Sequence, residues 1–239
     1  MDRTEAVRFP GPDGLVLSGR LEHANTDSPV QPRAAAVFAH CFTCGKHSRA
    51  ATRISRSLAA RGFTVLRYDM PGIGESDGDF ADSRFASRID SVVAAASFVG
   101  DQVAPVRLLV GHSLGGATVL AAAGRLDAVR GVATIAAPFD PGHVTGLLAP
   151  ARAELASAGE AEVTIAGRVF RVRQDVVDEL ADQPQRDRIS ALRRALIVLH
   201  SPTDTVVGIE HAAEIFSAAR HPKSFVSLPG ADHLLTNPE

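Results

Sequence analysis

The sequence predicts an α/β protein whose mostly parallel central sheet is covered by helices on both faces. Short apolar runs alternate with amphipathic stretches along most of the 239 residues, which is the pattern of strands joined by crossover helices. Several runs, such as residues 34–40, are apolar throughout, as expected of strands that are buried on both faces. The length also fits one α/β domain, so residues 1–239 are expected to form a single domain.

The expected elements begin with a hairpin and continue as strands alternating with helices. A cluster of turn-forming residues at 11–14 predicts the hairpin turn, and Gly62 stands where a glycine commonly ends a helix. Residues 71–83 are rich in glycine, aspartate and serine and predict a loop. In chain order we expect a hairpin (7–21), a strand (34–40), a helix (48–61), a strand (63–69), a helix (84–99), a strand (106–110), a helix (114–124), two strands (131–137 and 195–200), a helix (210–219) and a last strand (224–228).

The alternation of strands and helices breaks after the sixth strand. Residues 161–172 predict a small hairpin around Gly167, and residues 175–181 predict a short helix. Long connections in compact domains are usually functional, whereas the alternative is an irregular connection without a role. We therefore interpret residues 141–190 as a small lid, inserted into the domain over the expected active site.

Composition and charge exclude several classes of partner. The net charge is −2, and acidic and basic residues are interspersed, which favours neither nucleic acid nor an anionic membrane as a partner. The first residues lack the apolar core of a secretory signal, and the longest apolar runs are too short to cross a bilayer. We therefore expect a cytoplasmic protein.

The most informative segment places a serine between a strand and a helix. The apolar strand at 106–110 leads directly into Gly111-His-Ser113-Leu-Gly115, and a helical stretch follows. An abrupt strand-to-helix turn strains the residue at its apex, and glycines on either side avoid a collision. This turn would raise the Ser113 hydroxyl above the sheet edge and direct the Leu114 N–H to the same place. Neither a Gly-Lys-Ser/Thr phosphate loop nor a Gly-x-Gly-x-x-Gly dinucleotide motif is present in this segment.

This turn, the segment that starts at His40 and the end of the chain resemble the α/β-hydrolase superfamily. Residues 38–44 (FAHCFTC) and 137–141 (APFDP) are similar to a narrower group, the bacterial α/β-hydrolases that are fused to, or encoded with, an OsmC-type domain. The resemblance covers nearly the whole chain and implies an α/β-hydrolase fold, a serine hydrolase and a bacterial source. It also implies an OsmC-type domain as a partner, in a longer parent protein or in the same operon.

On this resemblance, the residues after His40 supply a second donor to the oxyanion hole. The family carries His-Gly-x there, and Cys41 stands in the glycine position, so the match assigns the donor N–H to Phe42, beside that of Leu114. Each such donor stabilises a transition state by about 3 kcal/mol. Cys41 is the alternative donor because it departs from the family pattern. For His40 we favour a structural role, anchoring the loop through a hydrogen bond.

A serine nucleophile needs a base, and the base needs a carboxylate that orients it. In this fold the order along the chain is serine, acid, histidine. His233 follows the last expected strand and is the predicted base, and Asp204 follows the strand before it and is the predicted acid. Asp140 is the competing acid because it ends an earlier strand. Asp232 is a neighbour of the base, so its side chain is expected to diverge from that of His233.

These residues predict a carboxylesterase-like serine hydrolase that cleaves small acyl esters through an acyl-enzyme. Ser113 attacks the acyl carbonyl, and His233 accepts the serine proton and later activates water. The reaction requires no metal and no cofactor. Thioesters and other acyl substrates remain alternatives, because the fold does not choose among them.

Two features of the sequence support other interpretations. Cys41 and Cys44 form a Cys-x-x-Cys pair, which in other folds carries redox chemistry, so a redox-linked protein is the alternative to two small half-buried side chains. A binding module that has lost catalysis is a third alternative. The chain also ends at Glu239, shortly after His233, where this fold usually adds one more helix. A missing helix would expose an apolar strip and favour a homodimer.

Overall fold

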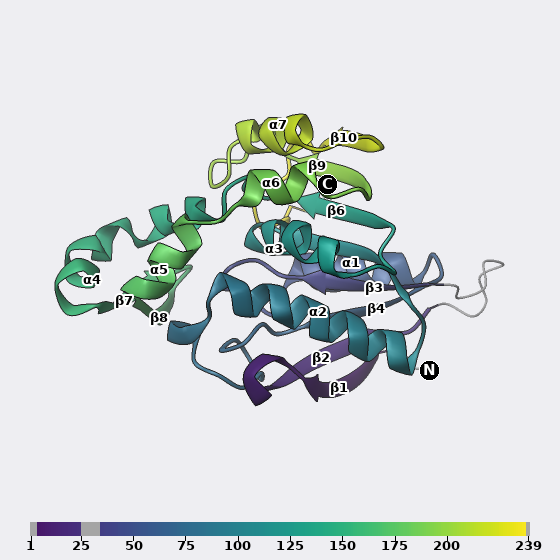
Figure 1. Ribbon diagram of the computed structural model, residues 1–239, viewed down its shortest axis with the longest axis horizontal. Coiled ribbons are helices and arrows are strands. Elements are labelled where there is room, and N and C mark those ends of the chain that lie inside the picture. The colour runs from purple at the N-terminus through teal and green to yellow at the C-terminus, as the bar shows by residue number, and fades with distance from the viewer. Residues whose placement is uncertain (1–3, 25–33, 238–239) are drawn as a thin grey trace.

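An eight-stranded sheet forms the centre of the protein in the computed structural model, which describes residues 4–24 and 34–237 (Figure 1). Its strands lie in the order β1-β2-β4-β3-β5-β6-β9-β10. In chain order they are β1 (Thr4–Pro10), β2 (Val16–Glu22), β3 (Ala34–Ala39), β4 (Phe63–Tyr68), β5 (Val106–His112), β6 (Gly131–Ile135), β9 (Ala195–His200) and β10 (Lys223–Ser227). β2 pairs antiparallel with β1 and with β4, and the other neighbouring strands are parallel. The predicted mostly parallel sheet and its N-terminal hairpin are confirmed.

Helices cover both faces of this sheet, as predicted. The larger ones are α1 (Arg49–Ala59), α2 (Phe85–Gln102), α3 (Leu114–Ala122) and α7 (Ile209–Ala218), and short 3₁₀ turns are η1 (Pro12–Gly14), η2 (Phe80–Asp82) and η3 (Ala123–Arg125). Neighbouring residues of β3 show the two faces. Val37 packs into the apolar cluster that includes α2, α3 and α7, whereas Phe38 packs into the cluster that includes α1. Side chains that alternate in this way make each parallel strand apolar throughout.

Local signals set the ends of the elements. The hydroxyl of Ser48 accepts a hydrogen bond from the N–H of Ala51 at 3.3 Å, which caps the first turn of α1. Gly62 has a φ of 92°, the left-handed conformation that glycine adopts after a helix. β5 runs two residues further than predicted, because its pairing with β6 continues until His112 lies opposite Ile135.

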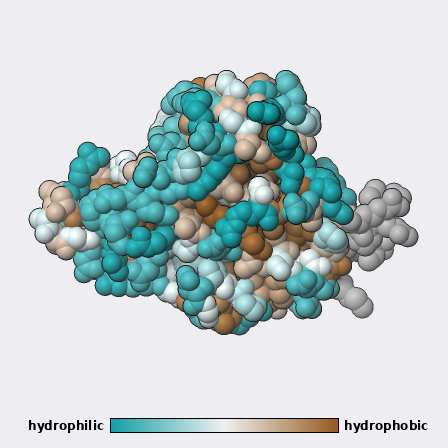
Figure 2. Space-filling view, viewed as in Figure 1, coloured by the Kyte–Doolittle hydropathy of each residue, from teal (hydrophilic) through white to brown (hydrophobic). Residues whose placement is uncertain are grey.

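Residues 141–190 form a lobe that projects from one end of the sheet, at the left of Figure 1. The predicted hairpin and short helix are present in it. Its elements are η4 (Pro141–Ala151), α4 (Arg152–Ala158), β7 (Glu160–Ile165), β8 (Arg168–Arg173), α5 (Gln174–Ala181) and α6 (Gln185–Ser190). The sequence did not predict η4, α4 or α6. In η4 the glycines and the internal proline hide the helical pattern. Figure 2 shows that hydrophilic side chains cover most of this lobe on the visible face.

Hydrogen bonds and aromatic contacts attach the lobe to the sheet domain. The carboxylate of Glu179 in α5 accepts from the N–H groups of Phe85 and Ala86, at 2.7 and 3.0 Å, at the start of α2. This is a favourable place for a negative charge because the first amides of a helix are unpaired and its dipole is positive there. The ring of Phe80 lies 4.5 Å from that of Phe170 in β8. Both contacts therefore fix the lobe to residues 80–86 of the sheet domain.

The α1 face of the sheet is less well covered near its last strands. Ile197 and Leu199 of β9 are half-buried, and Val226, which pairs with Leu199, is 38% exposed. These side chains are partly exposed on this face, and the homodimer stays a prediction. Within residues 4–24 and 34–237, no helix is long and apolar enough to span a membrane.

Candidate active site

Ser113 lies at the apex of a strained turn between β5 and α3. Its φ of 53° and ψ of −127° are unusual for a residue with a side chain. A Cβ on Gly111 would overlap the carbonyl of Gly115, and one on Gly115 would overlap the carbonyl of Ala39. Both glycines are therefore required by the close approach of backbone to backbone, for the reason that the sequence pattern indicated. The turn presents the Ser113 hydroxyl at the carboxyl edge of the parallel strands.

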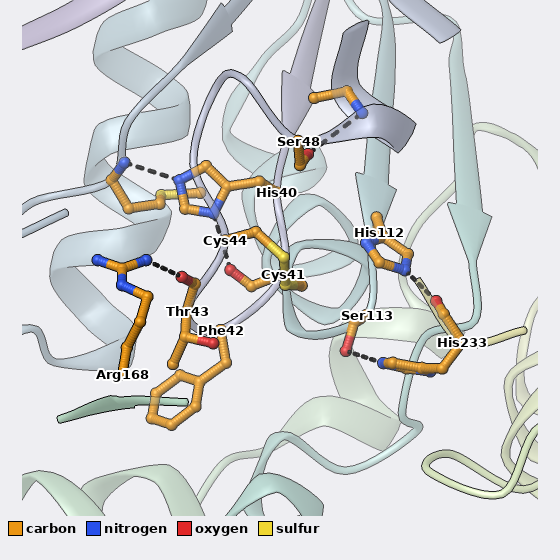
Figure 3. The surroundings of a disulfide bond; sticks show 12 residues. His40, Cys41, Phe42, Thr43, Cys44, Ser48, His112, Ser113, Arg168 and His233 are labelled. Atoms are coloured by element: carbon orange, nitrogen blue, oxygen red, sulfur yellow. Dashed lines mark hydrogen bonds between the residues drawn. A yellow bond between two sulfur atoms is a disulfide. The ribbon is translucent and has the colours of Figure 1, made fainter. Parts of the chain in front are cut away.

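His233 and Asp204 join Ser113 in one line of hydrogen bonds. Nδ1 of His233 lies 2.8 Å from Oδ2 of Asp204, and Nε2 lies 3.0 Å from Oγ of Ser113, as the dashed line in Figure 3 shows for the second contact. A carboxylate can only accept, so Nδ1 carries the proton and Nε2 accepts from the serine hydroxyl. The structure thus brings together the three residues that the sequence singled out.

The surroundings of Asp204 favour its charged form. Burial would raise the pKa of this carboxyl, but the hydrogen bond from His233 and those from two loop amides lower it below the usual range. These amides are the N–H groups of Val206 and Val207, which donate to Oδ1 at 2.8 and 3.0 Å. Both oxygens are therefore satisfied, and Asp204 is held in position to orient His233.

The other two aspartates considered as the acid make different contacts. Asp140 caps η4 by accepting from the N–H of Gly142 at 2.8 Å. Asp232 accepts from the hydroxyl and the N–H of Thr236. Neither forms a hydrogen bond with His233 among the contacts of the described residues, which leaves Asp204 as the carboxylate in contact with it.

The loop after β3 lies beside the serine, and His40 holds its first peptide. Nε2 of His40 accepts from the N–H of Met70 at 3.0 Å, so Nδ1 carries the proton and donates to the carbonyl of Cys41 at 2.7 Å. A carbonyl and the next N–H point in opposite directions across one peptide, so this bond sets the direction of the Phe42 N–H. Burial lowers the pKa of His40 to about 4, so it stays neutral near pH 7. This is the anchoring role predicted for it.

Two arginines hold the next carbonyl groups of the same loop. Arg88 of α2 is fully buried and donates to the carbonyl of Phe42 at 3.3 Å, and Arg168 of β8 donates to that of Thr43 at 2.9 Å. Burial lowers the pKa of Arg88 to about 10, and its Nε has no hydrogen-bond partner within the described chain. The sequence did not single out either arginine, although an arginine on the buried face of an expected helix is a signal that could have been noticed.

With these carbonyls held, several backbone N–H groups remain unpaired. Those of Cys41, Phe42 and Leu114 donate to no acceptor within residues 4–24 and 34–237. They include both predicted oxyanion donors and the alternative at Cys41. Unpaired amides beside a serine hydroxyl are the groups that an oxyanion hole needs.

A disulfide joins Cys41 to Cys44 across this loop, with the two Cα atoms 5.2 Å apart. Figure 3 shows it between His40 and His112. The sequence left open a redox-linked pair or two separate, half-buried side chains. In the structure the two sulfurs are bonded to one another.

An apolar cavity of about 400 Å³ opens beside Ser113 and His233. The sheet domain supplies Cys41, Phe42 and Thr43, and the lobe supplies Val144, Leu147, Ile165 and others. Residues 141–190 therefore form one wall of the cavity. His143 of η4 also lies on this wall and pairs with His211 of α7, whose Nε2 is 3.1 Å from Nδ1 of His143. The sequence predicted no role for this pair, because the two residues are far apart along the chain.

Sheets of this topology that carry a serine on a strained strand-to-helix turn define the hydrolases of the α/β-hydrolase fold. The chain belongs to the alpha/beta hydrolase family, whose family model matches residues 36–239.

Two solved structures share the fold, and a curated protein is similar in sequence. The esterase domain of a Rhodothermus marinus protein is 45% identical, with a TM-score of 0.77, over 98% of this chain and 91% of that one. Est1E of Butyrivibrio proteoclasticus, solved with ferulic acid, is 20% identical, with a TM-score of 0.79, over 97% and 93%. The uncharacterized protein YfhR of Escherichia coli K12 is 26% identical over 96% of this chain and 73% of its own. The family model and the two solved structures confirm the predicted fold.

Proposed function

We propose that this protein is a serine carboxylesterase that cleaves small acyl esters, with Ser113 as nucleophile, His233 as base and Asp204 as the orienting acid. The observation that carries the proposal is the unbroken hydrogen-bond line from Asp204 through His233 to Ser113 at an apolar cavity. The esterase domain that is 45% identical to this chain supports an ester as the substrate.

In the proposed reaction, Nε2 of His233 accepts the proton of Ser113 while Oγ attacks the acyl carbonyl. Asp204 stabilises the imidazolium that forms, because it is ionised and already bonded to Nδ1. His233 then donates this proton to the leaving alcohol, and an acyl-enzyme remains. A water molecule, activated by the same histidine, releases the acid and restores Ser113.

The N–H groups of Phe42 and Leu114 stabilise the oxyanion in this proposal, with Cys41 as the alternative to Phe42. Their support is that all three are unpaired and that His40 fixes the peptide between Cys41 and Phe42. Each donor that is in place before the reaction contributes about 3 kcal/mol to transition-state stabilisation.

The cavity favours a small apolar acyl group. Its volume of about 400 Å³ and its lining by Phe42, Val144 and Leu147 suit short and medium chains, whereas few polar groups line it. The cavity does not distinguish an oxygen ester from a thioester, because Ser113 attacks the acyl carbonyl in both. We propose oxygen esters because the 45% identical relative is an esterase domain.

Hydrolysis of p-nitrophenyl acetate, butyrate and octanoate by wild type and Ser113→Ala tests this function. We expect activity on the shorter esters and a loss of about 10⁴-fold or more in kcat for Ser113→Ala. Ser57→Ala, which removes a hydroxyl from the exposed surface of α1, is the matched control and should retain full activity. A butyryl thioester assayed in parallel decides between ester and thioester preference. Wild-type activity that survives in Ser113→Ala would contradict the proposal.

A further inference from the structure

The disulfide between Cys41 and Cys44 occupies the position where an unusual set of ligand atoms converges. One Sγ from each cysteine and one ring nitrogen of His112 all lie within 4.8 Å of one another. Cys41 and His112 are buried and Cys44 is half-buried. Two thiols separated by two residues, with a histidine from a distant strand, form the type of set that binds zinc in proteins.

His112 is oriented as a metal-binding histidine would be. Its Nε2 lies 2.7 Å from the carbonyl oxygen of His233, so Nε2 carries the proton and donates. The neutral ring then keeps a lone pair on Nδ1. Metal-bound histidines usually donate their other N–H to a carbonyl or carboxylate in this manner, which fixes both the tautomer and the ring plane.

The set also lies against the proposed catalytic residues. Cys41 lines the same cavity as Ser113 and His233, and His112 directly precedes Ser113 in the turn. The peptide between Cys41 and Phe42 carries a proposed oxyanion donor, and its carbonyl is the group that His40 holds. A change at Cys41 therefore acts at once on the cavity and on this loop.

We propose that reduction of the Cys41–Cys44 disulfide creates a site for one thiophilic divalent cation such as Zn²⁺, held by both thiolates and Nδ1 of His112, and that the bound ion inhibits the hydrolase. The inhibitory part rests on the proposed function, whereas the binding site does not. The disulfide excludes the ion, because its sulfurs are bonded to each other and cannot both act as thiolate ligands.

The proposed exchange balances in two steps. A dithiol reductant transfers two electrons and two protons to the disulfide, breaking the S–S bond, leaving two thiols and becoming a disulfide itself. The cation then binds both sulfurs and releases the two thiol protons. Two thiolates neutralise the charge of a divalent cation, so the filled site carries no net charge, which suits its burial.

Inhibition follows from the position of Cys41 and His112. Two thiolates bonded to one tetrahedral ion must separate further than two sulfurs in a disulfide, so the loop has to shift when the ion binds. The shift moves the peptide that carries the Phe42 N–H. The fourth ligand position, unfilled by these three residues, is open to water or to an acyl substrate.

Cobalt titration of the reduced protein tests the site without reference to ester hydrolysis. Co²⁺ is added to anaerobic protein that has been treated with dithiothreitol, freed of it, and shown by thiol assay to hold two free thiols. We expect one equivalent to give the visible bands of tetrahedral cobalt with a thiolate-to-metal charge-transfer band, and Zn²⁺ to displace it. Oxidised protein should give neither band.

Variants separate this site from other metal-binding groups. We expect His112→Ala to weaken Zn²⁺ binding by about tenfold or more, and Cys44→Ser to abolish the charge-transfer band of a two-thiolate site. His221→Ala removes an exposed histidine and should bind as wild type does. Ser113→Ala should also bind cobalt as wild type does, which shows the site even in a protein without esterase activity.

Ester hydrolysis then tests inhibition in the same samples. Reduced wild type with one equivalent of Zn²⁺ should lose most of its activity and regain it with a chelator, and oxidised wild type should be insensitive to Zn²⁺. Three outcomes overturn the proposal: a disulfide that resists dithiothreitol in the folded protein, cobalt spectra without thiolate bands, or equal binding by wild type and His112→Ala. Full activity with the site loaded overturns its inhibitory part.

Discussion

The carbonyl oxygen of His233 accepts a hydrogen bond from Nε2 of His112 at 2.7 Å. The bond joins the last residue of β5 to the loop after β10, two strands that β6 and β9 separate in the sheet. His112 precedes Ser113, so one residue of the strained turn holds the main chain of the proposed base. The distance between Ser113 and His233 thus depends on a backbone contact as well as on the orienting carboxylate.

The first prediction concerns this contact. His112→Leu removes the donor, and the loss of a buried hydrogen bond costs about 1 kcal/mol. Because the His233 main chain is then less well held, we expect kcat to fall by about 5- to 10-fold with little change in KM. Steady-state kinetics on p-nitrophenyl butyrate measures this. His47→Leu, at an exposed histidine, is the control, and a kcat within twofold of wild type in both variants would contradict the expectation.

The second prediction separates the two candidate acids. Asp204→Asn removes the carboxylate that contacts His233, and it should lower kcat by about 10⁴-fold because the amide favours the wrong tautomer. Asp140→Asn replaces a cap of η4 and should leave kcat within a fewfold of wild type. We would measure kcat for both variants by steady-state kinetics and verify their folding by circular dichroism. The reverse order of effects would assign the role to Asp140.

Much of this fold and of the candidate site could be predicted from the sequence, because the signals were local. A serine between glycines after an apolar run identified the turn, and the order of strands along the chain indicated that Asp204 and His233 would lie near Ser113. Parallel strands align their carboxyl ends, so residues that directly follow different strands meet at one edge. The proximity of Asp204 and His233 to Ser113 followed from this rule, without any knowledge of individual side-chain contacts.

What could not be predicted depends on contacts between distant segments. Arg88 looks like an ordinary helix residue, and only the fold shows that it reaches the carbonyl of Phe42. The two cysteines permit free thiols, a disulfide or metal ligands, and their spacing alone does not decide. The 3₁₀ helix η4 was missed because its glycines and proline disfavour a regular helix, and packing against α5 and α3 stabilises it instead.

The third prediction concerns stability in acid. Burial lowers the pKa of His40 and of His112 from 6.5 to about 4. At a pH between 6.5 and about 4, these histidines bind protons in the unfolded chain but not in the folded chain. The free energy of unfolding should therefore decrease as the pH falls through this window. Each histidine contributes up to about 1.4 kcal/mol per pH unit in this window, and its contribution levels off below about pH 4.

Urea unfolding at pH 7, 6 and 5 measures this dependence. His112→Leu cannot be protonated at this position, so its free energy of unfolding should fall less steeply than that of wild type between pH 7 and 5. Equal slopes for the two proteins would show that His112 is not buried in its neutral form.

The fourth prediction separates stability from catalysis at Arg88. No carboxylate within the described chain forms an ion pair with this buried guanidinium, and its Nε is unpaired. Arg88→Met removes the hydrogen-bond donor to the Phe42 carbonyl, which destabilises the folded protein. It also removes a buried charge that has no carboxylate partner, which stabilises the folded protein and offsets that loss. We expect kcat to fall by about tenfold while the free energy of unfolding changes by less than about 1.5 kcal/mol.

Arg168→Met is the matched control for Arg88, because it removes an exposed donor to the next carbonyl of the same loop. An exposed carbonyl can be hydrated when its donor is lost, so kcat should fall by less than about threefold. Equal effects of the two substitutions would contradict this expectation and would mean that burial of Arg88 has no special role in placing the Phe42 peptide.

The last prediction concerns the size of the acyl pocket. Gly146 lies on the cavity wall, and a Cβ built on it meets no atom within 4 Å, so a larger side chain can enter without moving the backbone. Gly146→Phe should fill part of the cavity and exclude long acyl chains, while acetate still fits. We expect kcat/KM for the octanoate ester to fall by about tenfold or more relative to acetate, since steric exclusion of a few methylenes forfeits about 0.8 kcal/mol each. Gly124→Phe places the same side chain on an open surface away from the cavity and should preserve the wild-type profile. An unchanged octanoate-to-acetate ratio in Gly146→Phe would show that the acyl chain binds elsewhere.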